Sequence, residues 1–437
     1  MAKLLTFGIY NNLYKYIWLY VIFRLLYAYI FNYKTIPTNL KPFILDSFPN
    51  NFIFTGSFFE YITTFFISFI FRRYELYQLK NEDNISISDT NSYKSTGTGA
   101  FNLIQLNIEK GKISKSFCFI IIVIVLANLL TGSYYNLYLE GTDFWELELL
   151  LISLVNTMIF GEPLYRHQIF AILITIISCS ITKTLSLIEI FRIDEDKLFK
   201  IYIWIIPLAI ISFIIAEFLR AYGYCKAKYY FNLKFLSVNV FLKYYGLIGS
   251  LICLLGSLIS TYKECSSYYD NKNIKYICRN YKDNHNYFDS FKLYFDKFWN
   301  KETTSKNVGY VFLFILKNTF LAMTSFFTFS IIKHLGPEFY VCANSIYYLI
   351  VEILNVIGYL ISHENEVNKY KIISEIFLVI SAAIYLEFIE LNFFKINYDS
   401  KRNIEFRLLS EMSELNINDE SEELEEKEIK RVDSNFY

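Results

Sequence analysis

Four ionisable side chains lie inside long apolar runs of this chain, where they could bind a solute or carry charge. Lys317 and Glu352 fall at similar depth in two neighbouring runs near the C-terminus, and Glu60 and Glu148 lie in two earlier runs. An ionisable group in hydrocarbon costs from about 2.5 kcal/mol upward, so such groups normally face a bundle interior or a water-filled cavity. We therefore expect these side chains to line an interior site.

The pair in the later runs has two interpretations. In the first, Lys317 anchors an anionic or carbonyl-bearing solute, Asn318 and Asn344 donate hydrogen bonds, and Glu352 serves as counter-ion or proton carrier. In the second, Lys317 and Glu352 form an interior salt bridge that sets the register of the two helices. The residue types leave both open.

The earlier runs contribute Glu60, Glu148 and Asn156 to the same candidate site. Glu148 could carry a proton that drives exchange, or it could line a helix mouth beside Glu146, where water solvates both carboxylates. Asn156 could contact solute or bond a neighbouring helix, as buried amides commonly do.

Composition indicates the environment of these residues. Apolar residues make up 54% and charged residues 19% of the chain, and the apolar residues collect in long blocks, which is typical of a polytopic membrane protein. Basic and acidic residues balance at 42 each, so no electrostatic footprint favours nucleic acid. The expected partners are the lipid bilayer and a small-molecule solute, with the protein a monomer or homodimer.

About 20 mostly apolar residues cross a bilayer as a helix. That length predicts an all-α fold of about ten transmembrane helices, near residues 14–32, 51–71, 116–138, 144–161, 168–190, 200–220, 238–261, 308–332, 338–361 and 370–391. The first run resembles a secretory signal, but Arg24 and Tyr27 interrupt it and no small-residue cleavage pattern follows, so we expect a retained span.

Two local patterns within these runs favour structural roles. Gly246, Gly249 and Gly256 lie along one helical face of the seventh run, a spacing that favours close helix packing. Glu217 and Arg220 are spaced as a structural i,i+3 pair, expected at the cytosolic end of the sixth run.

The distribution of basic residues predicts that both termini are cytosolic, because short cytosolic connections are enriched in Lys and Arg. These basic residues are Arg72, Arg73, Lys110, Lys112, Lys115, Arg220, Lys226, Lys228 and Lys234. The domain boundaries follow: a five-helix half over residues 1–192 with a disordered cytosolic loop at 82–99, a five-helix half over 193–395 with a long non-cytosolic loop at 262–307, and a disordered acidic cytosolic tail at 396–437.

Cys265 and Cys278 share that long non-cytosolic loop. If the loop faces an oxidising compartment, they are the natural disulfide pair; two unpaired thiols are the alternative.

An internal echo indicates duplication. The segment Gly141-Thr142-Asp143-Phe144-Trp145 is repeated in residue type by Gly336-Pro337-Glu338-Phe339-Tyr340, and each precedes or opens the fourth apolar run of its half. Related halves are common in secondary transporters, where they move against each other around a site near the bilayer midplane.

The segment Phe160-Gly161-Glu162-Pro163-Leu164-Tyr165-Arg166-His167-Gln168 resembles the connection after the fourth helix in the drug/metabolite transporter superfamily, which includes EamA-type exporters, nucleotide-sugar transporters and the chloroquine-resistance transporter group. The resemblance spans about ten predicted helices, from residue 14 to 391. It implies two inverted five-helix repeats around a central cavity and, for the loop at 262–307, a disulfide. The second half departs from the pattern, with Ser362-His363-Glu364-Asn365-Glu366 in place of the glycine-acid turn.

These observations predict a secondary transporter of a small polar solute that works by alternating access, in an endomembrane of Golgi, ER or vacuole type in preference to the plasma membrane. No catalytic residues, metal or cofactor are expected, because the four histidines do not form closely spaced clusters. A multi-span receptor or scaffold is the alternative, followed by an intramembrane enzyme.

Overall fold

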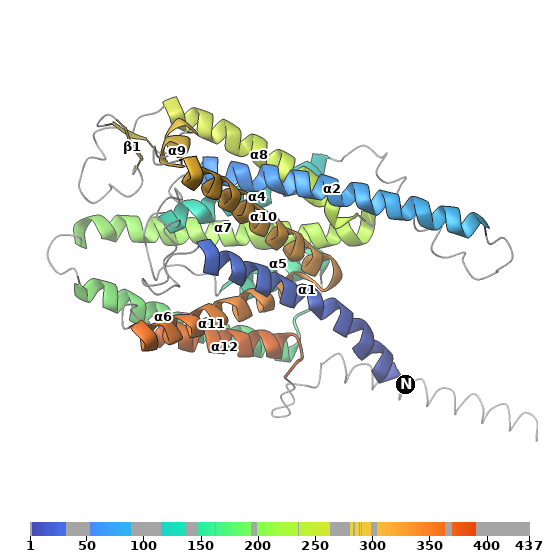
Figure 1. The fold of residues 1–437 in the computed structure, drawn as a ribbon. Coiled ribbons are helices and arrows are strands. Elements are labelled where there is room, and N and C mark those ends of the chain that lie inside the picture. Colours follow the sequence, from blue (N-terminus) through green and yellow to red (C-terminus); the bar gives the residue numbers. More distant parts are fainter. Residues whose placement is uncertain are drawn as a thin grey trace, which may run out of the picture.

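A computed structural model describes residues 2–31, 53–88, 115–136, 147–161, 163–193, 199–234, 236–262, 280–282, 285–287, 289, 291–298, 304–362 and 369–389. These residues form α1 (Ala2–Phe31), α2 (Ile53–Ser88), α4 (Lys115–Asn136), α5 (Glu148–Phe160), α6 (Arg166–Ile193), α7 (Phe199–Lys234), α8 (Val238–Tyr262), β1 (Asn280–Lys282), β2 (His285–Tyr287), α9 (Phe291–Phe298), α10 (Thr304–His334), α11 (Pro337–Ser362) and α12 (Lys369–Tyr385). Figure 1 shows them as a helical bundle.

Every predicted span coincides with one helix, of which α5 is the shortest at 13 residues, so the helical fold class is confirmed. The small antiparallel pair of β1 and β2, in the loop between α8 and α9, is the one departure from an all-α fold in the described residues. Four helical segments there are both long and apolar enough to cross a membrane: Ile53–Gln78, Val238–Thr261, Val311–His334 and Pro337–Ile357. The full count of ten spans stays a prediction.

The outer surface of the bundle is apolar on more helices than these four. Large apolar side chains with high exposure recur every three or four residues along several helices, including Trp18, Ile22 and Leu26 on α1, Leu173, Ile177 and Ile181 on α6, and Leu251, Leu255 and Leu258 on α8. Soluble monomers rarely expose such continuous apolar stripes, whereas a lipid-facing surface requires them.

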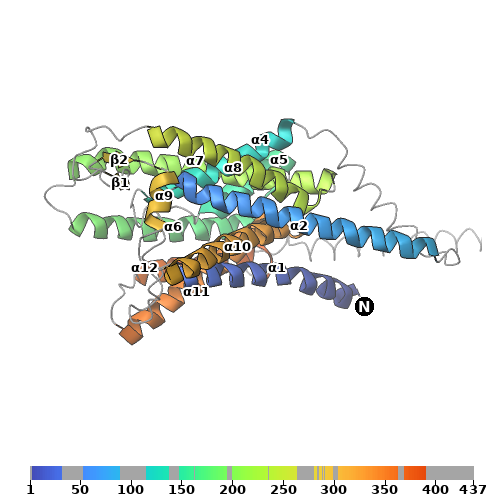
Figure 2. The ribbon, with the colours of Figure 1, turned by 45° about the horizontal axis from the view of Figure 1, so that its top comes forward.

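The helices pack in a defined set of pairs (Figures 1 and 2). Helix α1 packs on α10 and α11, α2 on α8 and α10, α4 on α7 and α8, α5 on α7 and α11, and α12 on α6 and α11. In both views the start of α1 lies at the end of the bundle opposite to the β hairpin and α9.

Glycines allow α8 to approach α2 closely. A Cβ atom at Gly246 would lie 2.5 Å from the backbone nitrogen of Phe65 and 2.7 Å from the carbonyl oxygen of Tyr61, and one at Gly249 would lie 2.5 Å from the Tyr61 ring. The prediction of close packing along this face is therefore confirmed.

The segment before α9 is anchored to the start of α2. The carboxylate of Asp289, which is fully buried, accepts hydrogen bonds from the backbone nitrogens of Phe54 (2.6 Å) and Thr55 (3.1 Å) and from the Thr55 hydroxyl (2.5 Å). These are first-turn N–H groups that have no partner within the helix, and a carboxylate there also complements the helix dipole. On α9, Tyr294 then stacks on Phe59 of α2.

The end of α2 and the start of α11 can be compared with the sequence-based expectations. Helix α2 continues to Ser88, so residues 82 to 88 are helical although disorder was expected from 82; residues 89 to 99 lie outside the described part. Gly336 has a φ of 135°, a conformation that favours glycine, and Pro337 begins α11, so the second copy of the echoed segment does open a helix. The first copy, residues 141 to 145, lies outside the described residues.

Candidate solute-binding site

Arg24 on α1 is the centre of an interior polar network. Its Nη1 donates to the hydroxyl of Tyr20, one turn earlier, and to Oδ1 of Asn344 on α11, while its Nη2 donates to the hydroxyl of Tyr348 at 3.3 Å. The spacing of Tyr20 and Arg24 by four residues puts both on the face of α1 that meets α11. All three acceptors are uncharged.

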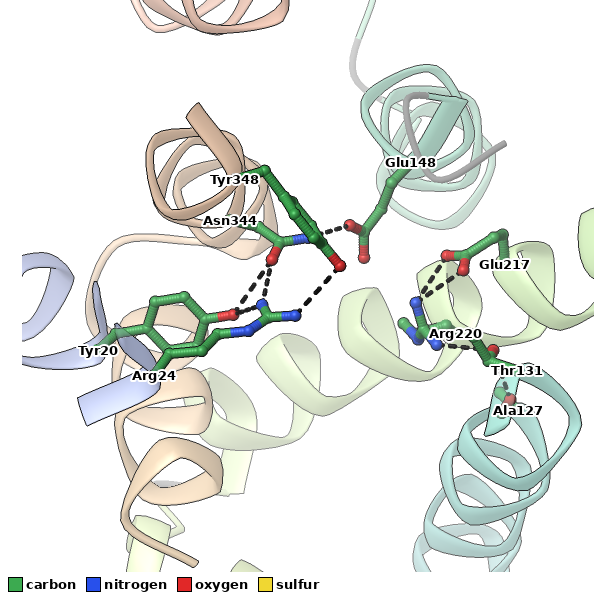
Figure 3. A network of polar contacts seen from close by, with 9 residues as sticks. All are labelled: Tyr20, Arg24, Ala127, Thr131, Glu148, Glu217, Arg220, Asn344 and Tyr348. Carbon is green, nitrogen blue, oxygen red and sulfur yellow. Dashed lines mark hydrogen bonds and ion pairs between the residues drawn. The ribbon is translucent and has the colours of Figure 1, made fainter. Parts of the chain in front are cut away.

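Asn344 connects this arginine to α5 (Figure 3). Its Nδ2 donates to Oε2 of Glu148 at 3.4 Å, and both side chains are buried. Glu148 lies in the first turn of α5, where the positive end of the helix dipole favours a carboxylate. The other carboxylate oxygen, Oε1, is buried and has no hydrogen-bond partner among the described residues.

A second arginine lies on the other side of Glu148. On α7, Arg220 donates from Nη1 to both carboxylate oxygens of Glu217, at 2.7 and 2.9 Å, and from Nη2 to the hydroxyl of Thr131 on α4 at 2.7 Å. The predicted i,i+3 pair is confirmed. Its expected place at a helix end is wrong, because α7 continues to Lys234 and the pair lies near the middle of the helix, with Glu217 only 1% exposed.

Tyrosine rings form the walls around Arg24. The guanidinium carbon lies 4.3 Å from the ring centre of Tyr347 and 5.2 Å from that of Tyr348, distances at which the aromatic face attracts a cation. Tyr340 then contacts the rings of Tyr20 and Tyr224 edge-on, at 5.7 and 5.2 Å. The polar network therefore lies inside an aromatic shell.

The predicted residues Lys317, on α10, and Glu60, on α2, are close enough to interact electrostatically. Glu60 also interacts electrostatically with Tyr27 of α1, and Tyr27 with Arg24. The pairing proposed from the sequence, between Lys317 and Glu352, stays a prediction.

Two other predicted residues bond within their own helices. Asn318 donates from Nδ2 to the carbonyl oxygen of Phe314 at 2.9 Å, and Glu352 accepts from Asn355 at 3.3 Å. Both are buried, but these contacts do not include the network around Arg24.

Asn156 lies at the other end of α5 from Glu148 and bonds a neighbouring helix. Its Nδ2 donates to Oε1 of Glu338, in the first turn of α11, at 3.0 Å. Both residues line a cavity of about 200 Å³, together with Ser153, Thr157, Pro163, Leu164, Tyr165, Gln168, Tyr385 and Leu386. The helix-bonding interpretation of Asn156 is thus confirmed.

This cavity is bordered by the connection between α5 and α6. Helix α5 ends at Gly161, which has a φ of 69° and donates its backbone N–H to the carbonyl oxygen of Thr157. Helix α6 begins at Arg166, so the connection is short, as the sequence indicated.

Cys265 and Cys278 lie outside the described residues, as do the predicted acidic tail and most of the loop at 262–307. Among the described residues, Cys225, Cys253 and Cys342 are free thiols.

Glu148 and Asn344, which are hydrogen-bonded in the structure, are both predicted as site residues from the sequence, whereas no site role is predicted for Arg24, Tyr20, Tyr348 or Arg220. A signal was present: Arg24 is an arginine within an apolar run, and such residues usually face a functional interior. Its partner Asn344 lies far away in sequence, so only packing could identify the contact.

The described residues contain no group of three or more His, Cys, Asp or Glu side chains that could hold a metal ion. No protein-family model and no curated protein sequence matches the chain. The resemblance to drug/metabolite transporters therefore depends on the short segments quoted above.

Proposed function

We propose that this protein is a ten-span secondary transporter that moves a small polar solute by alternating access, with the network around Arg24, Asn344 and Glu148 as its solute site. The observation that carries the proposal is the position of this network, which is interior, charged and shared between helices from both halves of the sequence. An intramembrane charged site between related halves is the usual arrangement in secondary transporters.

The packing pairs support two related halves. In the proposed halves the equivalent helices are α1 and α7, α2 and α8, α4 and α10, α5 and α11, and α6 and α12. Each contact in one half should then have a counterpart between the equivalent helices. The contacts α1–α10, α1–α11 and α2–α10 have the counterparts α7–α4, α7–α5 and α8–α4, and all six are observed. The contacts α2–α8, α5–α11 and α6–α12 each join two equivalent helices, so each is its own counterpart. The correspondence is not complete: α11 packs extensively on α12, whereas the counterpart contact of α5 with α6 is small, and the contacts of α10 with α7 and α11, and of α11 with α7, have no counterpart of similar extent among the described residues.

The network residues follow the same correspondence. Glu148 and Asn344 are separated by 196 positions, and Arg24 and Arg220 have the same separation in the printed sequence. The two copies of the echoed segment differ by one position from this spacing. A hydrogen bond between equivalent residues, such as Asn344 and Glu148, requires both to lie near the axis that relates the halves.

The contacts of α5 with α11 run antiparallel, from Glu148–Asn344 to Asn156–Glu338, which supports inversion of the halves. Each half contains five spans, which is an odd number, so equivalent helices cross the membrane in opposite directions. Helix α5 would therefore run toward the cytosol and α11 away from it. The cavity beside Asn156 and Glu338 would then face the cytosol, while α9 and its aromatic contacts cover the opposite end. An endomembrane location with cytosolic termini remains part of the proposal.

Transport by purified protein in liposomes tests this function. We expect uptake or exchange of at least one labelled polar solute above protein-free liposomes, and a loss of about 10-fold or more in Arg24→Gln, because a buried charge-assisted contact is removed. Arg73→Gln is the matched control, since Arg73 is exposed on α2 and should leave transport unchanged. Equal solute entry with and without protein, across metabolite, amino-acid and drug-like panels, would contradict the proposal and favour a receptor or scaffold.

A further inference from the structure

The charges of the network divide into one satisfied pair and two groups that are not directly paired. Arg220 and Glu217 neutralise each other through two hydrogen bonds. Arg24 bonds only uncharged oxygens among the described residues, and Glu148 accepts one bond from an uncharged amide. Buried charges are normally paired, so the cation of Arg24 and the carboxylate of Glu148 are the groups with unused capacity.

A single amide separates these two groups. Oδ1 of Asn344 accepts from Arg24, and Nδ2 of the same amide donates to Glu148. Figure 3 shows Asn344 between them. The Asn344 amide thus offers its oxygen to the Arg24 cation and its N–H to the Glu148 carboxylate. A ligand with a carboxylate next to an ammonium group would offer the same two contacts, an acceptor to Arg24 and a donor to Glu148.

We propose that this site binds a compact zwitterion of the α-amino acid class, with the ligand carboxylate on Arg24 and the ligand ammonium group on Glu148. This assignment rests on the proposed transport function and narrows its substrate. Arg24 offers a planar guanidinium suited to bidentate binding of a carboxylate. Oε1 of Glu148 is buried and has no partner in the described residues, so it can accept a bond from the ammonium group.

The charge balance favours a zwitterion over a simple anion or cation. With both carboxylates ionised, Arg24 and Arg220 balance Glu148 and Glu217, so the site is neutral. A zwitterion keeps it neutral, whereas an anion or a cation adds an uncompensated charge to a poorly solvated interior. In this arrangement the Asn344 side chain turns aside and the ligand takes over its two contacts.

The aromatic shell suits the rest of such a ligand. Tyr347 and Tyr348 lie against the guanidinium of Arg24 and limit the ways in which a carboxylate can approach it. Their rings provide apolar surface for a ligand side chain.

Binding by the unmodified protein is the first test. The purified full-length protein in detergent is titrated with the common L-α-amino acids, and the best ligand is compared with its decarboxylated amine and its deaminated acid. We expect saturable binding of the zwitterion and at least about 30-fold weaker binding of both analogues, because each leaves one buried charge unpaired. If the deaminated acid bound as tightly as the zwitterion or more tightly, the assignment would be overturned, because Glu148 would then not bind an ammonium group of the ligand.

Two variants assign the ends of the ligand. Arg24→Gln should abolish the preference for the zwitterion over the amine, and Glu148→Gln should abolish the preference for the zwitterion over the acid. Arg73→Gln should retain the wild-type preferences. If Arg24→Gln does not fold, Arg24→Lys, which keeps the charge and loses the bidentate fork, should weaken carboxylate binding while the chain retains its elution profile.

Transport measurements separate this assignment from the proposed function. If the protein bound no amino acid but transported other solutes in a way that depends on Arg24, the zwitterion assignment would be overturned. The transporter proposal would still stand. Amino acids that bind with the expected preferences but never cross the membrane would support the site and contradict transport.

Discussion

At the scale of single residues, the interior network shows two ways of holding charge. Arg220 and Glu217 lie on one helix, where Nη1 of the arginine donates to both carboxylate oxygens, so neither side chain depends on a ligand. Arg24 and Glu148 lie on different helices and meet only through the amide of Asn344. The first arrangement favours stability and the second leaves both charges available.

The Arg220–Glu217 pair gives a prediction about stability. Arg220→Met and Glu217→Leu should each lower the free energy of unfolding by about 3–5 kcal/mol, because each leaves an uncompensated buried charge, whereas the double variant should recover most of the loss. Thermal or denaturant unfolding in detergent measures the double-mutant cycle. Additive losses in the double variant would show that the two side chains do not act as a pair.

At the scale of elements, the contact between α2 and α8 depends on residues without side chains. Gly246 and Gly249 face the backbone and the ring of α2 at distances that no Cβ atom tolerates. Close approach of this kind maximises dispersion contacts, which drive helix association where lipid surrounds the helices.

The glycines provide a matched comparison of two alanine substitutions. Gly246→Ala should lower the thermal midpoint of the purified protein, because its Cβ would collide with the backbone of Phe65 and Tyr61, which cannot move without separating the helices. Gly56→Ala, on α2, should not lower it, since a Cβ atom there meets nothing within 4 Å. Similar midpoints for the two variants would contradict the described packing of α8 on α2.

At the scale of the whole molecule, the two halves of the sequence are interleaved. Helices α6 and α12 come from different halves and meet through the hydroxyls of Thr175 and Ser381, which lie 2.7 Å apart and are both fully buried. Most of the principal packing pairs also join one half to the other, so neither half has a closed core of its own.

A cross-link tests this interleaving. In protein with a protease site inserted between α6 and α7, Thr175→Cys with Ser381→Cys should form a disulfide under oxidising conditions, and the two cleavage fragments should migrate together until reductant is added. Each single variant serves as the control and should give separate fragments in both conditions. Separate fragments from the oxidised double variant would place α6 and α12 apart.

Local patterns in the sequence predicted the helices well. Each of the ten predicted runs became a helix, and Gly161 ended α5 where a glycine can adopt a left-handed conformation. These features depend on apolar length and on short-range backbone preferences, which neighbouring residues carry. The end of α7 was misplaced because its helix continues through polar residues that no hydropathy pattern includes.

What the sequence by itself determined is the class of this protein: apolar helices, a few charges within them, and an echo between two halves. Which charges meet was decided only by the tertiary structure. Arg24 and Asn344 are separated by 320 positions, and Lys317 interacts with Glu60 from the opposite half. Local hydrophobicity places each residue at a depth along its own helix, but the choice of neighbour depends on how all the helices pack together.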